Sequence, residues 1–351
     1  MAVFVLIHYI RLSIILFPNV YLQTMDSKDY RSKLFQIKNE AQFNEMCLFA
    51  FDYQYHGVEI YRQFVDHLPI NPKTITHYTQ IPFLPISFFK SHTLIQGEPQ
   101  IVFKSSGTTA MPRSKHFVRD LSLYEHSFYS GFEQFYGSIE EYCVLALLPS
   151  YIENGDSSLV YMAEKLIKKS KNKDSGFYLN NLSELAEKLN ILDASGQKII
   201  LIGVSYALLD LIEQFQFKLK NTIVMETGGM KGRRIEMIRE DLHAQLKSGF
   251  GLRSIHSEYG MTELLSQAYS KGNGIFTSPM WMKILIRDTN DPFDILSDSQ
   301  SGGINIIDLA NINSLAFIET KDLGKIHSNQ DFEILGRFDD SDIRGCNLLI
   351  A

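Results

Sequence analysis

The segment Lys104–Arg113, with the sequence KSSGTTAMPR, carries the residues best suited to bind a phosphate group. Its run of Ser, Gly and Thr allows backbone N–H groups and hydroxyls to converge on an anion. Gly107 permits close approach to a ligand, and Pro112 fixes the exit of the loop. The pattern is neither a Gly-x4-Gly-Lys-Ser/Thr loop nor a Gly-x-Gly-x-x-Gly fingerprint. A phosphate loop and a solvent-exposed Ser/Thr turn both remain open at this point.

The segment His256–Glu263, HSEYGMTE, places a carboxylate, a hydroxyl and an aromatic ring close to a glycine. The Glu263 carboxylate can hold Mg²⁺, Thr262 can bond a phosphate oxygen, and Tyr259 can stack on a base. The alternative is a tight turn at Gly260 that opens a helix, with Glu263 in a favourable first-turn position. His256 is a candidate base, although a structural, hydrogen-bonded histidine is the more ordinary interpretation.

Two polar segments near the end of the chain offer groups for a sugar. They are TKDLG, residues 320–324, and GRFDDSDIRG, residues 336–345. An Asp can accept hydrogen bonds from both ribose hydroxyls, and an Arg can contact ribose or phosphate. Taken alone, each is an ordinary polar turn.

Alternating strand and helix patterns must position these groups. The apolar runs at residues 142–148, 198–203 and 222–226 predict strands buried on both faces. Helical patterns follow them from Ser158, from Ala207, and through Ile235, Ile238, Leu242 and Leu246, the last helix capped by Gly249. The alternation predicts an α/β fold with mainly parallel, doubly wound sheets, and the short runs after Gly302 predict a smaller antiparallel β-rich subdomain.

The N-terminal region divides into an apolar stretch and a helical one. A membrane helix over the first 22 residues would bury Arg11 near its centre, at a cost of roughly 2.5–3.5 kcal/mol on insertion scales. A signal peptide also fits poorly. We therefore expect residues 1–24 to be an extension outside the fold, with a helical pattern from Met25 to His67. The expected domains are an α/β core over 25–300 and the β-rich subdomain over 301–351.

The composition narrows the class of protein. The 351-residue chain is 45% hydrophobic with a formal net charge of −6, so a broad basic face for nucleic acid is not expected. Its three cysteines, Cys47, Cys143 and Cys346, contain no Cys-x-x-Cys pair, which disfavours a disulfide framework or a zinc site and suits a reducing cytoplasm. Cys47 and Cys143 lie in apolar patterns and are expected in the core.

The order KSSGTT, YGMTE, TxD turn and GRxDD resembles the succession of motifs in the superfamily of AMP-forming acyl- and aryl-acid ligases. The resemblance runs from about Ile101 to Gly345. More narrowly, IPFLPISFFKS, LLPSYIENGDSSLVYM and ETGGMKGRR are similar to acyl-protein synthetases of the LuxE type, which serve the fatty-acid reductase of bacterial bioluminescence.

The resemblance implies ATP and Mg²⁺ as cofactors and assigns roles to particular residues. Thr262 would meet the α-phosphate, Glu263 would hold Mg²⁺, Arg337 would assist at the ribose, and Asp339 would match the hinge position. The phosphate-binding set would be Ser105, Ser106, Gly107, Thr108, Thr109 and Arg113. The nucleotide-binding set would be Gly228, Gly229, Tyr259, Gly260 and Asp322.

This sequence departs from the superfamily in two respects. Arg113 stands where the family has a Lys after the Pro of the phosphate loop, and the two cations are not equivalent at a phosphate. The chain also stops six residues after Gly345, without the mobile C-terminal domain that carries the adenylation lysine.

The predicted reaction joins a fatty or similar carboxylic acid to AMP and transfers the acyl group to a protein thiol. Cys346 is a candidate acyl carrier, and a partner protein with a reactive thiol is the other acceptor. A coenzyme A or amide-forming ligase and a non-catalytic nucleotide- or acyl-binding subunit remain alternatives.

Overall fold

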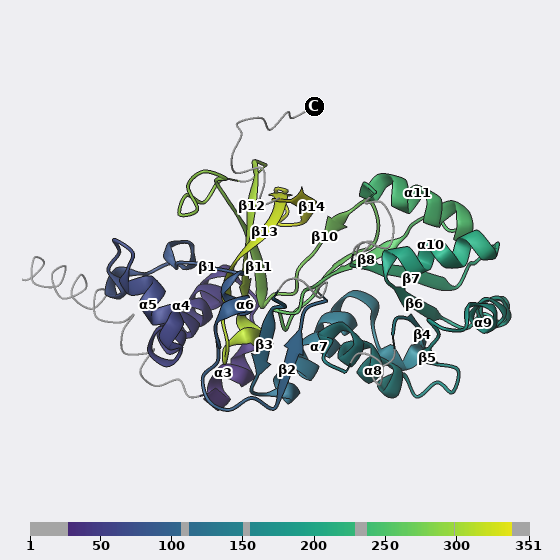
Figure 1. Ribbon diagram of the computed structural model, residues 1–351, viewed down its shortest axis with the longest axis horizontal. Coiled ribbons are helices and arrows are strands. Elements are labelled where there is room, and N and C mark those ends of the chain that lie inside the picture. The colour runs from purple at the N-terminus through teal and green to yellow at the C-terminus, as the bar shows by residue number, and fades with distance from the viewer. Residues whose placement is uncertain (1–26, 107–111, 150–154, 229–236, 298, 339–351) are drawn as a thin grey trace, which may run out of the picture.

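A six-stranded, mainly parallel sheet occupies the right-hand part of Figure 1. The computed structural model of the chain describes residues 27–106, 112–149, 155–228, 237–297 and 299–338. The strand order is β5-β4-β6-β7-β8-β9, and β9 alone in this order runs antiparallel to its neighbour. The strands are β4 (Cys143–Leu147), β5 (Gly176–Phe177), β6 (Ile199–Gly203), β7 (Thr222–Thr227), β8 (His256–Tyr259) and β9 (Ala268–Ser270).

Helices cover both faces of this sheet, so its strands are built from continuous apolar runs. Every residue of β4 and β6 is buried. In Figure 1, α7 (Leu121–Tyr136) and α8 (Ser158–Ser170) lie on one face, and α10 (Ser205–Gln214) and α11 (Arg239–Phe250) on the other. Helix α9 (Leu182–Ala194) connects β5 to β6. The predicted α/β class and the three predicted buried strands are confirmed.

Helix α11 differs from its prediction at both ends. It begins at Arg239, after an N-cap at Ile238 that is 65% exposed, and Ile235 lies outside the described residues. Its C-cap is Gly251, which has a left-handed φ of 72° and donates its N–H to the carbonyl of Lys247. Gly249 lies inside the helix, where a Cβ would meet Ile212 of α10 at 2.5 Å. Gly249 therefore serves close helix packing, and the predicted cap at that position is wrong.

The helical pattern of residues 25–67 forms three helices in place of one continuous element. They are α3 (Ser27–Leu34), α4 (Glu40–Gly57) and α5 (Glu59–Asp66). The side chain of Asn39 accepts the N–H of Gln42 and so caps the start of α4. The expected extension over residues 1–24 lies outside the described residues.

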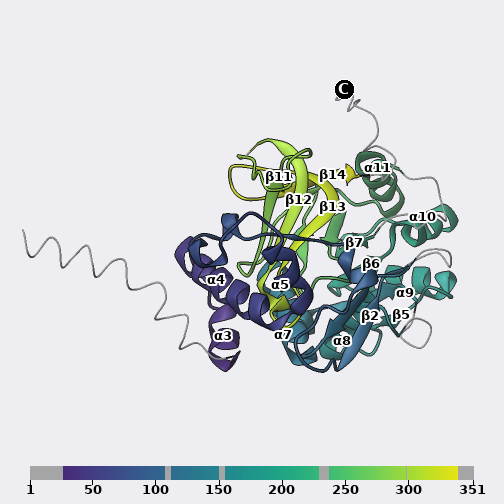
Figure 2. The ribbon, with the colours of Figure 1, turned by 60° about the vertical axis from the view of Figure 1, so that its left-hand side comes forward.

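A second, mixed sheet stands beside the first (Figures 1 and 2). Its order is β10-β14-β13-β12-β11, and β1 (Leu84–Pro85) pairs in parallel with β13. The other strands are β10 (Ile275–Phe276), β11 (Met282–Arg287), β12 (Ser301–Asp308), β13 (Phe317–Ile326) and β14 (Phe332–Arg337). They are antiparallel to one another. This sheet draws strands from both sides of residue 301, where the sequence suggested a boundary.

Short elements complete the described chain. Strands β2 (Ile101–Lys104) and β3 (Lys115–Val118) form an antiparallel hairpin, and α6 (Phe88–Ser91) precedes it. Four 3-10 turns connect the larger elements: η1 (Pro72–Thr74), η2 (Tyr78–Gln80), η3 (Ile139–Glu141) and η4 (Leu309–Asn311). Within the described ranges, no helix combines the length and apolar character needed to cross a membrane.

Two glycines with positive φ give a matched test of this packing. At Gly251 (φ 72°) and Gly196 (φ 83°) any residue with a side chain would strain the backbone, at a free-energy cost of about 1–2 kcal/mol. A Cβ at Gly251 would also meet Lys218 Cα and Phe217 O at 2.9 Å, whereas nothing lies within 4 Å at Gly196. We predict that Gly251→Ala lowers the free energy of unfolding by at least about 1 kcal/mol more than Gly196→Ala in urea denaturation. Equal losses would contradict the close approach at Gly251.

Candidate functional site

Backbone and hydroxyl bonds close the base of the Ser-rich loop between β2 and β3. The N–H of Ser105 donates to the carbonyl of Ser114 at 3.1 Å, and the N–H of Ser114 donates to Ser105 Oγ at 3.0 Å. The Ser105 hydroxyl is therefore part of the loop closure, while Ser106 is exposed. The predicted phosphate-binding residues Gly107, Thr108 and Thr109 lie outside the described residues.

Arg113 is held beneath the loop by an aspartate from a distant segment. Its guanidinium donates to both carboxylate oxygens of Asp156, at 3.3 and 3.2 Å, and to the carbonyls of Ser105 and Lys104. Lys104 Nζ lies 3.3 Å from the same carboxylate. Burial would raise the pKa of Asp156, but Arg113 and Lys104 hold it below its usual range. A phosphate at this loop would meet two cations that one carboxylate already orients.

Glu263 brings the YGMTE motif to the base of this loop. Its side chain is 5% exposed and lies close to the side chain of Ser114. Burial raises the pKa of Glu263, although Ser114 and the charges of Arg337 and Lys90 counteract part of the rise. Residues 261–267 form turns and extended chain, so the alternative of a helix opening at Gly260 is wrong.

Two fully buried side chains hold the backbone of Thr262 and Glu263. His116 Nδ1 lies 2.7 Å from the carbonyl of Thr262, and its Nε2 lies 2.9 Å from Asn311 Oδ1. Asn311 Nδ2 donates to the carbonyl of Glu263 at 2.8 Å. Burial lowers the pKa of His116 to about 4, and Nδ1 carries a proton when it donates to the carbonyl of Thr262. The two consecutive carbonyls are thus held by partners from β3 and η4.

Tyr259, Asp322 and Arg337, three of the predicted nucleotide-site residues, form one cluster. The Tyr259 hydroxyl donates to Asp322 Oδ2 at 2.7 Å, and Arg337 Nε lies 3.1 Å from Asp322 Oδ1. Strands β13 and β14 pair Asp322 directly with Arg337. Burial raises the pKa of Asp322, which Tyr259 and Arg337 partly oppose. The Arg337 side chain is 72% exposed, so its guanidinium remains accessible to a ligand.

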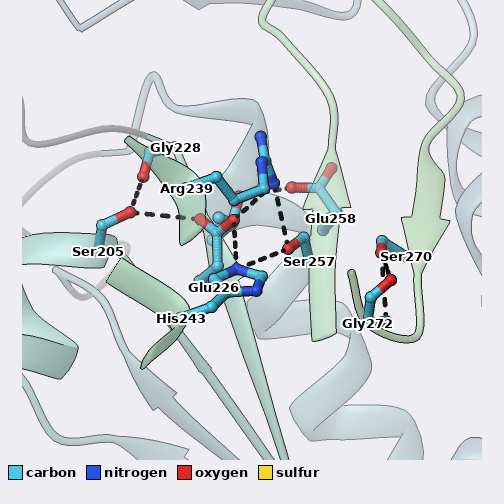
Figure 3. A network of polar contacts seen from close by, with 10 residues as sticks. Ser205, Glu226, Gly228, Arg239, His243, Ser257, Glu258, Ser270 and Gly272 are labelled. Atoms are coloured by element: carbon cyan, nitrogen blue, oxygen red, sulfur yellow. Dashed lines mark hydrogen bonds and ion pairs between the residues drawn. The ribbon is translucent and has the colours of Figure 1, made fainter. Parts of the chain in front are cut away.

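Gly228 and Gly260 mark the carboxyl ends of β7 and β8. Gly228 has a φ of 68°, and its carbonyl accepts the Ser205 hydroxyl at 2.5 Å (Figure 3). At Gly260 a Cβ would collide with Glu258 Oε1, so glycine here makes room for a neighbouring carboxyl. Gly229 lies outside the described residues. These strand ends form the edge of the parallel sheet where α/β proteins bind ligands.

A compact charge network stands behind Gly228. Figure 3 shows Glu226 of β7 facing Arg239 and His243 of α11, with Ser205 and Ser257 beside them. Glu226 Oε1 lies 2.9 Å from Arg239 Nη1 and 3.6 Å from His243 Nε2. Burial would raise the pKa of Glu226, but His243 and Arg239 hold it below its usual range. The network ties the end of β7 to the start of α11.

Glu258, the neighbour of Tyr259, pairs with no cation in the part of the chain that the structure describes. It is buried, its Oε2 accepts the Thr227 hydroxyl, and burial followed by the charge of Glu226 raises its pKa to about 7. The motif His256–Glu263 therefore contains two buried carboxyls, Glu258 and Glu263, of which only the second was predicted at the site.

The remaining candidate residues separate into core and undescribed positions. Cys47 and Cys143 are buried, as predicted, and burial raises the pKa of Cys143 to about 11. His256 has a structural setting: its Nδ1 contacts the Tyr136 hydroxyl at 3.2 Å, and burial lowers its pKa to about 4. Cys346 and Asp339 lie outside the described residues. Among the described residues, no group of three or more His, Cys, Asp or Glu side chains could hold a metal ion by itself.

Comparison with known proteins identifies the fold. No protein-family model and no curated protein matches the sequence. Solved structures do match. ATP-bound MatB from Rhodopseudomonas palustris is 17% identical over 69% of this chain and 49% of its own, with a TM-score of 0.51. 2-Hydroxyisobutyryl-CoA ligase in an open conformation with 2-HIB-AMP and CoA is 10% identical. The match covers 91% of this chain and 81% of the ligase, with a TM-score of 0.62. The same ligase in the postadenylation state with R3-HIB-AMP is 11% identical to this chain. That match covers 92% of this chain and 74% of the ligase, with a TM-score of 0.64.

The chain has the fold of the N-terminal domain of adenylate-forming ligases. It spans about half the length of MatB. At sequence identities of 10–17%, this similarity establishes the fold alone, and evidence for an activity has to come from the residues of the site.

The pKa of Glu258 predicts a pH-dependent stability. A carboxyl whose pKa rises from 4.5 to about 7 on folding stabilises the fold below the lower value and loses that contribution as pH rises through the upper one. Gln at this position stays neutral at every pH. Between pH 5 and pH 8, the free energy of unfolding of Glu258→Gln should therefore rise relative to wild type by on the order of 2 kcal/mol.

Urea denaturation at both pH values measures this difference. Glu98→Gln, at an exposed position, is the control and should track wild type. A Glu258→Gln difference that does not change with pH would show that the carboxyl titrates normally.

Proposed function

We propose that this chain is an ATP-dependent acyl-activating enzyme. A carboxylate oxygen of the substrate would attack the α-phosphorus of ATP. The bond from that phosphorus to the bridging oxygen of the β-phosphate would break, and acyl-AMP and pyrophosphate would form. The proposed acceptor of the acyl group is a protein thiol, as in acyl-protein synthetases of the LuxE type.

One observation carries this proposal: four motifs far apart in the sequence are joined by three side-chain contacts. Ser114, at the base of the Ser-rich loop, lies close enough to Glu263 of the YGMTE motif to lower the pKa of its carboxyl. Tyr259 of the same motif is hydrogen-bonded to Asp322, which pairs with Arg337 of the last motif. Phosphate, metal and sugar groups of one nucleotide could therefore be bound together.

The residues fit a magnesium ion shared with ATP. Glu263 is a buried carboxylate whose pKa is raised, chiefly by burial, because the charges of Arg337 and Lys90 only partly oppose it. Mg²⁺ in such sites takes one or two carboxylates and completes its shell with phosphate oxygens and water. When bound, the ion neutralises phosphate charge in the transition state.

The other groups position the reactants. The hydroxyl of Thr262 would contact the α-phosphate, with its backbone fixed by His116. Asp322 would accept hydrogen bonds from the ribose, and Arg337 would approach ribose or phosphate from the solvent side. Arg113 and Lys104 would provide positive charge at the phosphate loop. Catalysis of this kind depends on orientation and electrostatics more than on covalent chemistry by the protein.

A coenzyme A ligase is the second candidate for the overall reaction. The similarity to 2-hydroxyisobutyryl-CoA ligase over 91% of this chain favours it. Both candidates share the adenylation step and differ in the acceptor, so the acceptor must be determined separately.

We predict that Glu263→Gln lowers acid-dependent ATP–pyrophosphate exchange by at least about a hundred-fold, because a neutral amide is a poor ligand for Mg²⁺. Its melting temperature should equal or exceed that of wild type, since burial already disfavours the charged form. Glu240→Gln, an exposed substitution in the first turn of α11, is the control and should keep full exchange. Full exchange in Glu263→Gln removes this residue from the site, and no exchange in wild type with any acid refutes adenylation.

The acyl acceptor is tested by following a labelled acid in the presence of ATP and Mg²⁺. Transfer to Cys346 predicts hydroxylamine-sensitive label on the chain that Cys346→Ser abolishes. Cys143→Ala, in the buried strand β4, should keep the label because its thiol is inaccessible and has a raised pKa. Label that survives in Cys346→Ser excludes this carrier. Label recovered as a coenzyme A thioester favours the second candidate.

A further inference from the structure

Thr227, Glu258 and Gln267 come together where β7, β8 and β9 end. Thr227 and Glu258 are paired in the parallel register of β7 and β8. Gln267 directly precedes β9, whose register with β8 places it opposite Gly260. A Cβ on Gly260 would collide with Glu258 Oε1 and would lie 3.3 Å from Gln267 Cγ. Both long side chains therefore lie against the space that Gly260 leaves open.

This group has hydrogen-bond acceptors that the described residues leave without donors. Glu258 Oε2 accepts the hydroxyl of Thr227, and the structure shows no partner for Oε1 among the described residues. Gln267 Oε1 is buried and has no hydrogen-bond partner in the same part of the chain. The two residues are only 8% and 6% exposed. Buried acceptors are normally paired, so Gln267 Oε1, with the free oxygen of Glu258 beside it, points to a donor that the described residues do not supply.

Four polar groups near Glu258 are already engaged elsewhere. Figure 3 shows Arg239 and His243 gathered around Glu226, whose carboxylate they approach at 2.9 and 3.6 Å. The hydroxyl of Tyr124 donates to the carbonyl of Ser158, and that of Tyr136 contacts His256. Within the described ranges, Glu258 thus lies among tyrosine rings with no cation paired to it, which agrees with its raised pKa.

We propose that Glu258 and Gln267 bind a hydrogen-bond donor, a hydroxyl or an amino group, on the carbon chain of the acid that the enzyme activates. This inference rests on the proposed function. Gly260 lies against Glu258 and Gln267 and is followed within three residues by Thr262 and Glu263, so the two acceptors lie on the same stretch of chain as the proposed adenylation residues. An unsubstituted fatty acid would leave the two acceptors unpaired, and a site built for a donor discriminates strongly against an analogue that lacks it.

Exchange assays with matched acids test the inference. Each assay compares two carboxylic acids of equal chain length, one unsubstituted and one that carries a hydroxyl or amino group. The measured quantity is kcat/KM in acid-dependent ATP–pyrophosphate exchange. The best substituted acid should exceed its unsubstituted partner by at least about thirty-fold. Gln267→Met, which keeps the length but removes the acceptor, should reduce this ratio at least about ten-fold. Gln214→Met, at an exposed position, should leave it unchanged.

The two possible donors are separated by Glu258→Gln. This variant retains an acceptor oxygen but cannot be charged, so it should impair amino-substituted acids more than hydroxyl-substituted ones. Circular dichroism and the melting temperature verify that each variant is folded.

Failure of the inference is distinct from failure of the proposed function. Unsubstituted acids that react as well as substituted ones, or a ratio that Gln267→Met does not change, overturn the donor site while adenylation stands. Absence of exchange with every acid refutes adenylation itself. In that case, binding of the same acids measured by thermal shift still judges the site: a shift confined to donor-bearing acids and lost in Gln267→Met supports it, and no such shift overturns it.

Discussion

Hydrogen bonds from His116 and Asn311 to the backbone carbonyls of Thr262 and Glu263 are the constraint on which the site depends. The segment that carries these two residues has no helix or strand of its own to satisfy its peptide groups. A buried peptide group without a partner is costly, so side chains from the hairpin and from η4 must take the place of regular structure. Because the backbone is held, the direction of the Glu263 side chain is set by residues that need not contact a ligand.

The same segment is held from its other side by Asp308. This fully buried carboxylate accepts the N–H groups of Leu265 and Ser266, at 2.7 and 3.0 Å, and the Ser266 hydroxyl at 2.6 Å. Asp308 caps η4, the turn that also contains Asn311. The turn η4 and its cap therefore fix the carbonyl of Glu263 and the amides of Leu265 and Ser266. Substitutions in η4 would therefore disturb the candidate site even if η4 itself contacts no ligand.

Carboxyl groups in this region differ in what surrounds them, and that difference separates their roles. Asp156 has two cations and orients the base of the Ser-rich loop between β2 and β3. Asp322 accepts a hydrogen bond from the Tyr259 hydroxyl and pairs with the exposed guanidinium of Arg337, so a ligand could replace either partner. Glu263 and Glu258 are buried with raised pKa values and no direct ion pair among the described residues. The setting of Glu263 suits a metal ion, and that of Glu258 suits a hydrogen-bond donor on a substrate.

The sequence alone determined the three central apolar strands of the parallel sheet, β4, β6 and β7, and the candidate motifs, because continuous apolar runs and local groups such as YGMTE are short-range features. It could not identify Asp156 as the partner of Arg113, 43 residues away, or His116 as the support of Thr262, 146 residues away. Nor could it distinguish Gly249, which packs on Ile212, from the true cap at Gly251. These assignments depend on which distant surfaces meet. Pairing of strands and burial of charges are settled by the whole chain at once, so only the tertiary structure decided them.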